Sequence, residues 1–438
     1  MFFLITLITI SLLYVFLRFF TKKTMRFLSI LAYPFVKICI AKRVSNGLED
    51  KQRVYERYGI PSKERPSGDL IWIHSVSVGE TISVIPVIQE IKNQNPNISI
   101  LLTTTTLTAA KQVKNRLKNL VIHQFMPFDI FKWVKNFIDY WKPDVAIFVE
   151  SELWANILFY LKEKSIPTYL VNARFSERSK KHMIFIKNFF KILPLSIFKS
   201  VFVTTNNMEK IVKMLGANNT KILPNLKIIA DKLPVNYENK IRLQNKISER
   251  PAWIAVSTHP SEEQIIMDVH NKLRSQIPDI LTVIAIRHPE RCNEVKSIAC
   301  DFNLSYSIYS KNMKIESKLT SDLLIVDAIG CLGDFFEVID TVLMCGSFIP
   351  GIGGHNFLEP LKFGCNVATG VYIHNFEDVY ENVSQLCKKV SNADEIAEFV
   401  INSKKDFCRS TDILNITDLK KQWSLAINDI LRDIQYVS

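Results

Sequence analysis

The chain has 438 residues, of which 47% are aliphatic or aromatic and 22% are charged, and its formal net charge is +12. This composition excludes a disordered chain, and the lack of a short-period repeat excludes a solenoid. The length predicts two α/β domains of roughly 180 residues each, with extensions. The eight cysteines form no Cys-x-x-Cys pair, so neither a zinc site nor a disulfide framework is expected. Unpaired thiols at this frequency indicate the reducing environment of the cytosol.

The basic excess is concentrated near the start of the chain. Seven Lys or Arg residues precede the first acidic residue, Glu49. Nucleic-acid binders usually spread basic residues over a folded face, whereas juxtamembrane clusters contact anionic lipid headgroups. We therefore expect a membrane surface as a partner and no nucleic acid. The seven residues are Arg18, Lys22, Lys23, Arg26, Lys37, Lys42 and Arg43.

The same region carries an apolar segment. Between Met1 and Phe20 the only charged residue is Arg18, and this length is close to what a membrane-spanning helix needs. A signal peptide is disfavoured, because the segment starts without a basic residue and no small-x-small cleavage site follows. A second apolar stretch, Phe27 to Ile40, contains Pro34 and is typical of an interfacial segment. Residues 1–47 are predicted to be a membrane anchor and juxtamembrane segment whose basic flank is cytoplasmic. The alternative is that the segment up to Ile40 only lies on the membrane surface.

From Leu48 onward, short apolar runs alternate with stretches of helical spacing, which predicts parallel β-sheets covered on both faces. Helices are expected at segments such as Thr81–Asn93 and Leu107–Leu117. The predicted strands of the first half are Leu70–His74, Ser99–Thr103, Val121–Met126, Val145–Val149, Thr168–Val171 and Phe202–Thr204. Those of the second half are Trp253–Ser257, Leu281–Ile286, Leu304–Ile308, Leu323–Val326, Thr341–Cys345 and Asn366–Ala368.

A polar and charged stretch from Ile228 to Arg250 separates the two halves. We therefore predict an α/β fold of two doubly wound domains, residues 48–228 and 251–438, with a linker at 229–250. In such sheets ligands bind beyond the carboxyl ends of the strands, so the residues that follow strands are the candidates for chemistry.

The first predicted strand leads into the sequence WIHSVSVGE, which places Glu80 at a strand-to-helix turn. A carboxylate there can accept a proton from an attacking hydroxyl, and Val76 and Val78 can raise its pKa by desolvation. The alternative is structural, because a glutamate in the first turn of a helix also interacts favourably with the helix dipole.

The fourth strand ends in FVESELW, which places Glu150 and Glu152 on either side of Ser151. Strand-like alternation puts both glutamates on one side of the chain, whereas a helix that begins here would use Ser151 or Glu150 as its cap. The next strand leads into NARFSERSKK, a basic stretch that suits a phosphorylated acceptor but also has the composition of a solvated helix face. Its basic residues are Arg174, Arg178, Lys180 and Lys181.

Three turns that follow strands of the second half read STHPSEE, IRHPER and CGSFIPGIGGHNFLEP. An arginine at position 287 can contact a donor phosphate. The glycine-rich loop opens onto a predicted helix, so the backbone N–H groups near Gly353 and Gly354 can stabilise a phosphate leaving group. Asn356 and Glu359 have the spacing of a helix cap and its partner, which competes with binding of a ribose diol by Glu359.

Two histidines stand in these turns. His259 and His288 each precede a proline. A histidine satisfied within its own loop is the alternative to a ligand-binding one.

Taken in order, the segments WIHSVSVGE, FVESELW, VNARFSERS, PNLK, STHPSEE, RHPER and GGHNFLEP resemble the 3-deoxy-D-manno-octulosonic acid (Kdo) transferases of lipopolysaccharide synthesis. The segment ERYG also resembles that family, and the resemblance covers roughly Leu48 to Phe376. It implies a GT-B fold of two Rossmann-like domains facing a cleft, CMP-Kdo as donor and the lipid A precursor lipid IVA as acceptor. It further implies inverting transfer, no cofactor, no metal, and a location at the inner membrane.

The resemblance also assigns residues. Glu80 matches the general base of the family's SVGE segment, Glu152 or Glu150 matches the acids of its E-x-E-L-W segment, and Asn225 and Lys227 match its N-L-K turn. We therefore predict Glu80 and Glu152 as catalytic residues. The predicted acceptor site is Glu150, Arg174, Arg178 and Lys180. The predicted donor site is Ser257, Thr258, Arg287, His288, Pro289, Gly330, Gly353, Gly354, Asn356 and Glu359.

The sequence departs from the family in DAIGCLGDFFEVID, where Ala328 and Cys331 stand in place of a threonine and a glutamate. Gly330 retains the tight turn, and Asp334 is the nearest candidate to replace the missing acid. Two alternatives remain: another GT-B enzyme, such as a nucleotide-sugar epimerase or a UDP-dependent glycosyltransferase, and a catalytically inactive lipid-binding scaffold. Retention of Glu80 and Arg287 favours an active enzyme.

Overall fold

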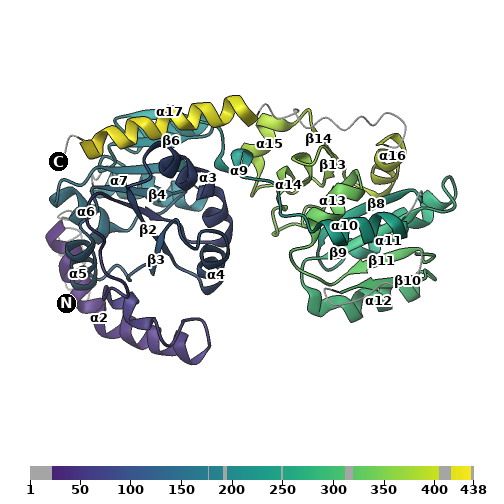
Figure 1. Cartoon of the computed structure of the whole chain (residues 1–438), viewed down its shortest axis with the longest axis horizontal. Helices are drawn as coiled ribbons and strands as arrows, with labels where there is room; N and C mark the ends of the chain where they lie inside the picture. Colours follow the sequence, from purple (N-terminus) through teal and green to yellow (C-terminus); the bar gives the residue numbers. More distant parts are fainter. Residues whose placement is uncertain are drawn as a thin grey trace, which may run out of the picture. The chain divides into compact units, whose positions relative to one another are not determined.

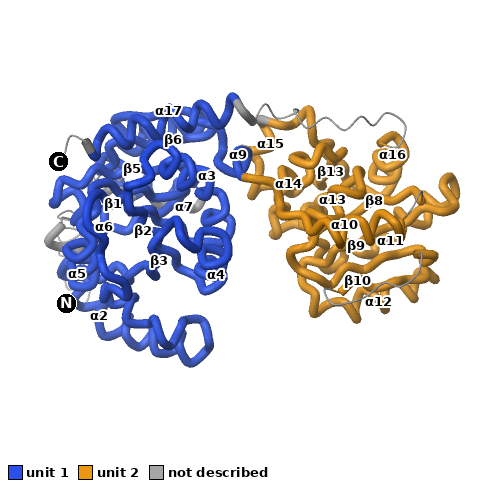
Figure 2. Tube along the Cα trace, viewed as in Figure 1, with its two compact units in different colours: residues 1–230, 417–438 blue, residues 231–416 orange. Residues whose placement is uncertain are grey.

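The computed structural model describes residues 22–175, 177–190, 195–247, 250–310, 319–403 and 416–435. The chain divides into two compact units (Figure 2). Unit 1 combines the chain up to Ala230 with the chain from Thr417 onward, and unit 2 is Asp231–Ile416. The predicted membrane-spanning segment lies outside the described residues. Within them, no helix is long and apolar enough to cross a membrane.

Unit 1 contains a seven-stranded parallel sheet with the strand order β3-β2-β1-β4-β5-β6-β7 (Figure 1). Its central strands are buried along their whole length, which explains why they are continuous apolar runs. The six strands predicted for this half are present, whereas β7 is not among the predicted strands. The strands are β1 (Leu70–His74), β2 (Ser99–Thr104), β3 (Ile122–Phe125), β4 (Val145–Val149), β5 (Thr168–Ala173), β6 (Ser200–Val203) and β7 (Thr220–Ile222).

Helices cover both faces of this sheet. Ile71 and Ile73 of β1 belong to a core shared with α3, α4, α9 and α17, whereas Leu70 and Trp72 pack on the other face with α5, α6, α7 and α8. The helices are α3 (Val78–Gln94), α4 (Leu107–Arg116), α5 (Phe131–Trp141), α6 (Ala155–Glu163), α7 (Glu177–Phe190), α8 (Asn206–Met214), α9 (Leu226–Ile229) and α17 (Ile416–Gln435).

The helix α2 (Lys22–Ser45) lies against α5 and α6 and is fixed to unit 1 by an ion-pair network. Buried Glu49 accepts from Arg43 (Nε–Oε1 2.7 Å) and from Arg57 of the 3-10 helix η1, Val54–Tyr58 (Nε–Oε2 2.9 Å). Gly59 ends η1 in a left-handed conformation, and a Cβ there would lie 2.0 Å from the backbone oxygen of Trp133. The ERYG segment therefore fixes α2 to the sheet, and its last position requires glycine.

Unit 2 contains a second seven-stranded parallel sheet, with the order β10-β11-β9-β8-β12-β13-β14. The six strands predicted here are present, and β14 is not among them. The strands are β8 (Ala252–Thr258), β9 (Leu281–Ile286), β10 (Tyr306–Tyr309), β11 (Leu323–Val326), β12 (Thr341–Met344), β13 (Asn366–Thr369) and β14 (Cys387–Lys389). The helices are α10 (Tyr237–Ile247), α11 (Glu262–Arg274), η2 (Pro289–Arg291), α12 (Cys292–Asp301), α13 (Leu332–Val338), α14 (Leu358–Leu361), α15 (Glu377–Val383) and α16 (Ala393–Ser403).

The stretch predicted as a linker, residues 229–250, is structured instead. It contains α10, which packs on α13 and belongs to unit 2. Although its sequence is polar, Leu243 and Ile247 give α10 a buried side. The boundary between the units therefore falls at Ala230, and the segment that follows it is part of unit 2.

The C-terminal helix α17 belongs to unit 1, although the sequence predicts that the second domain extends to residue 438 (Figures 1 and 2). Trp423 and Ile427 enter the core on the α3 face of the sheet. Trp423 Nε1 donates to the Pro224 carbonyl (2.8 Å), and Tyr169 Oη donates to Asp433 Oδ2 (2.5 Å). Burial of this amphipathic face explains why the helix returns to unit 1.

Replacing Trp423 with alanine is expected to destabilise the chain by about 3–5 kcal/mol, because the indole is almost fully buried. Leu425→Ala changes an exposed side chain of the same helix and should alter the free energy of unfolding by no more than about 0.5 kcal/mol. Urea denaturation followed by circular dichroism measures both variants. Equal losses in the two variants would contradict the packing of α17 on unit 1.

Candidate functional site

The predicted carboxylates of unit 1 gather at the carboxyl edge of its sheet, where ligands of parallel α/β sheets bind. Glu80 lies in the first turn of α3, directly after β1, and Glu150 and Glu152 follow β4, the neighbour of β1. The charges of Glu150 and Glu152 both act on Glu80. The structure therefore brings the three predicted glutamates into one group.

The basic stretch predicted to bind the acceptor begins at the same edge. Arg174 is half-buried after β5, and its backbone N–H points to the carbonyl of Glu150 (3.4 Å). Lys180 is half-buried on α7. Arg178 lies on the same helix, but its side chain is outside the described residues. The assignment of these three residues to an acceptor stays a prediction.

The turn before α3 positions the Glu80 carboxylate. Ser77 caps the helix by accepting from the backbone N–H of Glu80 (3.3 Å), and its hydroxyl donates to Glu80 Oε1 (2.9 Å). The backbone N–H of Val76 donates to Oε2 (2.7 Å). Glu80 therefore has the structural role expected of a residue in the first turn of its helix. Each carboxylate oxygen has two lone pairs, so both keep the capacity to accept a substrate proton.

The electrostatics of Glu80 match those of a general base. Burial raises the pKa of Glu80 to about 7, and the charges of Glu150 and Glu152 add to that effect. The hydrogen bonds from Val76 and Ser77 act in the opposite direction. A carboxylate poised near neutrality is ionised often enough to accept a proton and basic enough to hold it.

Glu152 is also held in a defined position. Trp154 Nε1 donates to its Oε2 (2.7 Å), and His74 Nε2 lies 3.9 Å from the same oxygen. Burial raises the pKa of Glu152, and the charge of Glu150 adds to that effect. Three carboxyl groups in one region do not ionise independently, because each charge disfavours the next.

Neither Glu150 nor Glu152 caps a helix, so the structural alternative for this pair was wrong. The helix α6 begins only at Ala155. Its free N–H groups at Asn156 and Ile157 are satisfied by Asp129, from the loop after β3 (3.1 Å each). A residue distant in sequence thus supplies the cap, and the two glutamates remain at the strand end.

Backbone conformation marks the same edge. Glu150, directly after β4, and Asn172, the residue before the last of the adjacent β5, have left-handed φ values of 62° and 55°. Such conformations cost on the order of 1 kcal/mol or more for non-glycine residues and concentrate at functional sites. Asn172 Oδ1 accepts from the backbone N–H of Leu226 (3.2 Å), which joins β5 to the PNLK turn.

Three buried polar atoms at this edge have no hydrogen-bond partner within the described residues: His74 Nε2, Glu150 Oε1 and Asn172 Nδ2. Lys227 Nζ lies 3.3 Å from Glu150 Oε1, an ion pair without hydrogen-bond geometry. Unpartnered buried polar atoms are rare in folded proteins. Their grouping around the carboxylates indicates a site for a polar ligand. The predictions did not include His74 or Asn172, because only their tertiary contacts reveal them.

In unit 2, one carboxylate fixes two of the turns that follow strands. Buried Glu262 accepts through Oε1 from the backbone N–H of Ser347 (3.0 Å) and Phe348 (3.1 Å). Its Oε2 accepts from the backbone N–H of Gly346 (2.8 Å) and His259 (3.0 Å). The turns after β8 and β12 are therefore held together. Glu262 was not predicted as a site residue, since partners 84 to 86 residues away are not visible in the local sequence.

His259 and His355 form a stacked pair in this region. Their Nε2 atoms are 2.8 Å apart, and their rings are nearly parallel, with centroids 5.1 Å apart. Burial lowers the pKa of His355 to about 4 and also lowers that of His259, and nearby Arg287 acts in the same direction. Both imidazoles are therefore neutral at pH 7, and one donates its N–H to the other.

Arg287 offers a positive charge beside this pair. It is exposed, and within the described residues no carboxylate lies at ion-pair distance from it. His288 is also exposed and lies 3.4 Å from Glu290, and Pro289 begins η2. The turn therefore presents an unpaired guanidinium next to neutral imidazoles, an arrangement that suits an anionic ligand.

The glycine-rich loop is followed by a helix, as the sequence predicts, but that helix is short. Gly353 and Gly354 have φ of 91° and 80°, and a Cβ on Gly353 would lie 2.5 Å from the side chains of His374 and Asn375. The following helix, α14, is a single turn of four residues, so its dipole contributes little to the binding of an anion. The backbone N–H of Gly354 donates to the Gly346 carbonyl (2.8 Å), so the other backbone N–H groups of the loop are its remaining candidate donors.

The predicted capping geometry after this loop is present in part. Asn356 Oδ1 accepts from the backbone N–H of Leu358 (3.3 Å), and its Nδ2 donates to Glu359 Oε1 (3.2 Å). Earlier in unit 2, Ser257 has φ of 60° and produces a register shift between β8 and β9. Thr258 follows, with a buried hydroxyl that has no partner within the described residues.

Comparison with known proteins identifies the family. Residues 52–230 match the family model described as 3-Deoxy-D-manno-octulosonic-acid transferase (kdotransferase). A probable mitochondrial 3-deoxy-D-manno-octulosonic acid transferase of Arabidopsis thaliana is 32% identical over 87% of this chain and 85% of its own length. The 3-deoxy-D-manno-octulosonic acid transferase of Rickettsia bellii (strain RML369-C) is 33% identical over 82% of this chain and 84% of its own. The chain belongs to the 3-deoxy-D-manno-octulosonic acid transferase family.

Solved structures of other enzymes share the fold of this Kdo transferase family member. UDP-GlcNAc 2-epimerase from Neisseria meningitidis is 13% identical, with a TM-score of 0.56 over 83% of this chain and 99% of that one. A glycosyltransferase from Rickettsia africae ESF-5 is also 13% identical, with a TM-score of 0.52 over 85% of this chain and 98% of that one. At these identities the likeness shows the fold alone. It agrees with the prediction of two parallel-sheet α/β domains of the GT-B kind.

The departure from the Kdo transferase pattern is not repaired by Asp334. Its carboxylate is buried and accepts from the backbone N–H of Asn236 (2.6 Å) and from Asn239 Nδ2 (3.3 Å) at the start of α10. Cys331 is buried at the start of α13, and Gly330 keeps its left-handed turn with φ of 88°. Asp334 thus has a structural role that its position in the sequence does not show.

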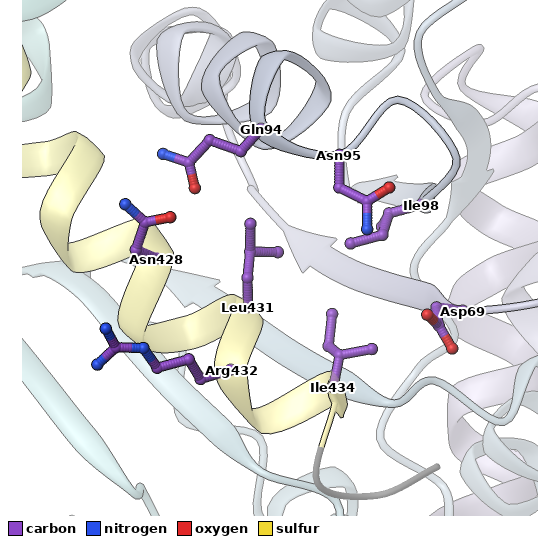
Figure 3. Close-up of a pocket in the computed structure, with 8 residues that line it drawn as sticks. All are labelled: Asp69, Gln94, Asn95, Ile98, Asn428, Leu431, Arg432 and Ile434. Atoms are coloured by element: carbon purple, nitrogen blue, oxygen red, sulfur yellow. The ribbon is translucent and has the colours of Figure 1, made fainter.

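A pocket of about 420 Å³ lies at the opposite edge of unit 1 (Figure 3). Its residues come from the segments before β1 and β2, from the end of α3 and from α17, so it lies at the amino ends of the strands. None of the predicted site residues lines it. The pocket is therefore separate from the carboxylate site of this Kdo transferase family member. Its lining is Asp69, Gln94, Asn95, Ile98, Asn428, Leu431, Arg432 and Ile434.

Proposed function

We propose that the chain transfers Kdo from CMP-Kdo to lipid IVA in lipopolysaccharide synthesis, with inversion at the anomeric carbon and without a metal. The observation that carries the proposal is Glu80, a carboxylate with a pKa of about 7 at the strand edge where ligands bind, in a member of the Kdo transferase family. The names of the similar proteins describe transfer of the same sugar. The donor and the acceptor are carried over from the family resemblance.

In the proposed reaction, an acceptor hydroxyl attacks the anomeric carbon of Kdo from the face opposite CMP. Glu80 takes the hydroxyl proton while the new C–O bond forms. The hydrogen bonds from Ser77 and Val76 hold the carboxylate in one orientation, which lowers the entropic cost of reaching the transition state. The proposed acceptor contacts are Glu150, Arg174, Arg178 and Lys180.

The departing CMP is a phosphate monoester, whose developing charge needs hydrogen-bond donors rather than a protonating acid. Arg287 is proposed to supply two of them, because its guanidinium is exposed and unpaired within the described residues. Backbone N–H groups of the glycine-rich loop near Gly353 are proposed to supply others, whereas that of Gly354 already donates to the Gly346 carbonyl. The rest of the proposed donor site is Ser257, Thr258, His288, Pro289, Gly330, Asn356 and Glu359.

Donor choice is tested by thermal unfolding with free nucleotides. CMP at about 100 times its Kd is expected to stabilise the chain by about 2.7 kcal/mol, which raises Tm by a few degrees, whereas UDP at the same concentration is not. Arg274→Ala, an exposed substitution on α11, should keep the shift. Equal protection by UDP would contradict a CMP donor. Protection by neither nucleotide would favour an inactive scaffold.

We further propose that α2 binds the cytoplasmic face of the inner membrane. It exposes six large apolar side chains, and its last turn carries Lys42 and Arg43. An apolar face flanked by basic residues suits the boundary between headgroups and acyl chains of an anionic bilayer. The six apolar residues are Phe27, Leu28, Ile30, Leu31, Phe35 and Ile38.

Membrane contact by α2 is tested with a fluorescent reporter on its exposed side. The indole of Phe35→Trp is expected to lie about 5–10 Å into the interface of anionic vesicles, where brominated lipid quenches it. Ile241→Trp places the same reporter on an exposed position of α10 in unit 2 and should stay unquenched. Quenching of neither reporter would contradict the proposed contact of α2.

A further inference from the structure

The tautomer of His74 is fixed by its surroundings. His74 ends β1 and is fully buried, and its Nδ1 lies 3.2 Å from the backbone oxygen and 2.9 Å from the hydroxyl of Thr103. The Thr103 hydroxyl accepts from Trp72 Nε1 (2.9 Å) and donates to the Ile73 carbonyl (3.4 Å), and the Thr103 carbonyl only accepts, so we assign the proton to Nδ1. Burial lowers the pKa of His74 to about 3, and nearby Arg57 acts in the same direction. The ring is therefore neutral, and its Nε2 is unprotonated and carries a lone pair.

That lone pair lies next to Glu152. Nε2 is 3.9 Å from Glu152 Oε2 and has no hydrogen-bond partner within the described residues. An ionised Glu152 would place a negative oxygen against the lone pair, which is unfavourable. A protonated Glu152 resolves both contacts of Oε2, because a hydroxyl can accept from Trp154 Nε1 and donate to His74 Nε2. The two atoms are 3.9 Å apart, and catalytic contacts of this length commonly tighten into hydrogen bonds when substrate binds.

We propose that His74 is a positioning residue that holds Glu152 in its protonated form through Nε2, so that Glu80 is the carboxylate that ionises and serves as the base. This inference rests on the proposed function for the role of Glu80. His74 itself touches no reacting atom and acts through Glu152.

The charged groups around the pair favour this arrangement. Glu150, which follows the same strand as Glu152, opposes ionisation of Glu152, and Glu80 on α3 is coupled to both. Lys227 of α9 pairs with Glu150 and so balances that charge. Arg57 disfavours a charged imidazole at His74. Because Lys227 balances the charge of Glu150 and protonation removes the charge of Glu152, Glu80 can ionise near neutral pH.

Two substitutions of His74 separate its two nitrogen atoms. The amide of His74→Asn can replace the Nδ1 donor to Thr103 but leaves no acceptor at the Nε2 position, whereas His74→Gln keeps an acceptor there. In His74→Asn, Glu152 ionises and its charge raises the pKa of Glu80. The acid limb of the pH profile, where kcat/KM for Kdo transfer falls with falling pH, is therefore expected to shift to higher pH by on the order of half a unit or more. His74→Gln should leave the limb in place, and thermal melting shows whether each variant is folded.

The substitution His74→Asn in a Glu152→Gln background tests whether His74 acts on Glu80 through Glu152. Glutamine at position 152 imitates the protonated acid, so His74→Asn should no longer move the limb. A shift of equal size in both backgrounds, or no shift in either, overturns the proposal.

A measurement without substrate separates this inference from the proposed function. Nitrogen-15 NMR of the full chain at pH 7 is expected to show His74 protonated at Nδ1 only. Carbon-13 spectra of labelled glutamate carboxyls, assigned by the signal lost in Glu152→Gln, should show Glu152 protonated. A proton on Nε2 of His74, or a Glu152 that titrates near the ordinary glutamate pKa of about 4.3, overturns the proposal whether or not the chain transfers Kdo.

Discussion

Replacing Glu80 with glutamine is expected to lower kcat for Kdo transfer by at least about 10²-fold, because an amide cannot accept the hydroxyl proton. Glutamine has nearly the same shape: its amide oxygen can accept from the backbone N–H of Val76, and its amide nitrogen can donate to the Ser77 hydroxyl, so the start of α3 should remain intact. Initial rates at saturating donor and acceptor measure the effect. Glu64→Gln, an exposed glutamate of the same unit, is the matched control and should keep the wild-type rate.

The pH profile gives an independent reading of the same group. Because the pKa of Glu80 is raised to about 7, its base form is half populated near neutral pH and is lost as the pH falls. The value of kcat/KM should therefore fall tenfold per pH unit below about pH 7. A limb near the ordinary glutamate pKa of about 4.3 would mean that another group is the base. An unchanged rate in Glu80→Gln would remove Glu80 from the chemistry.

Replacing Arg287 with alanine is expected to lower kcat/KM by roughly 10²- to 10³-fold, because a charge-assisted donor to the leaving phosphate is lost. The guanidinium is exposed and has no carboxylate at ion-pair distance within the described residues, so its removal should cost little stability. The same variant should also lose the thermal protection by CMP.

Arg274→Ala provides the control for this effect, since it removes an exposed positive charge from the same unit without touching the turn after β9. Steady-state kinetics with CMP-Kdo as the varied substrate compares the two variants. If Arg287→Ala behaves like Arg274→Ala, the positive charge of unit 2 acts only at long range and Arg287 does not contact the donor.

The core strands were predictable because their signal is local. Leu70–His74, Val145–Val149, Leu281–Ile286 and Leu323–Val326 are continuous apolar runs, and the structure places strands with these same bounds. β7 and β14 are three-residue edge strands whose side chains are largely half-buried or exposed, so no apolar run marks them. Edge strands need less hydrophobic sequence because one side faces solvent.

The packing of α17 on unit 1 and the cap of α6 were not predictable from the sequence, because both depend on residues that are distant along the chain. α17 is amphipathic, but the contact that places it on unit 1 joins Trp423 to Pro224 across 199 residues. The cap of α6 comes from Asp129 rather than from the adjacent glutamates. The linker prediction failed at α10 because two buried apolar residues are enough to fix a polar helix against α13.

The candidate site was predictable to the extent that it follows strand ends. Glu80, Glu150 and Glu152 were identified by that rule, and the structure places them in one group. The groups that tune them, His74 and Lys227, were not assigned roles from sequence, since a histidine within an apolar strand and a lysine in a short turn carry no pattern of their own. Glu262 was hidden for the same reason, because its four backbone partners are defined only by the folded turns.

Transfer of Kdo from CMP-Kdo to lipid IVA by the purified chain, read by mass spectrometry of the lipid product, tests the proposed function most directly. CMP-Kdo is generated in the same reaction, and an active Kdo transferase serves as the positive control. We expect a gain in lipid mass equal to one or more Kdo residues with the wild-type chain, and no gain with Glu80→Gln. An unchanged lipid mass with the wild-type chain, while the positive control reacts, would contradict the proposed activity.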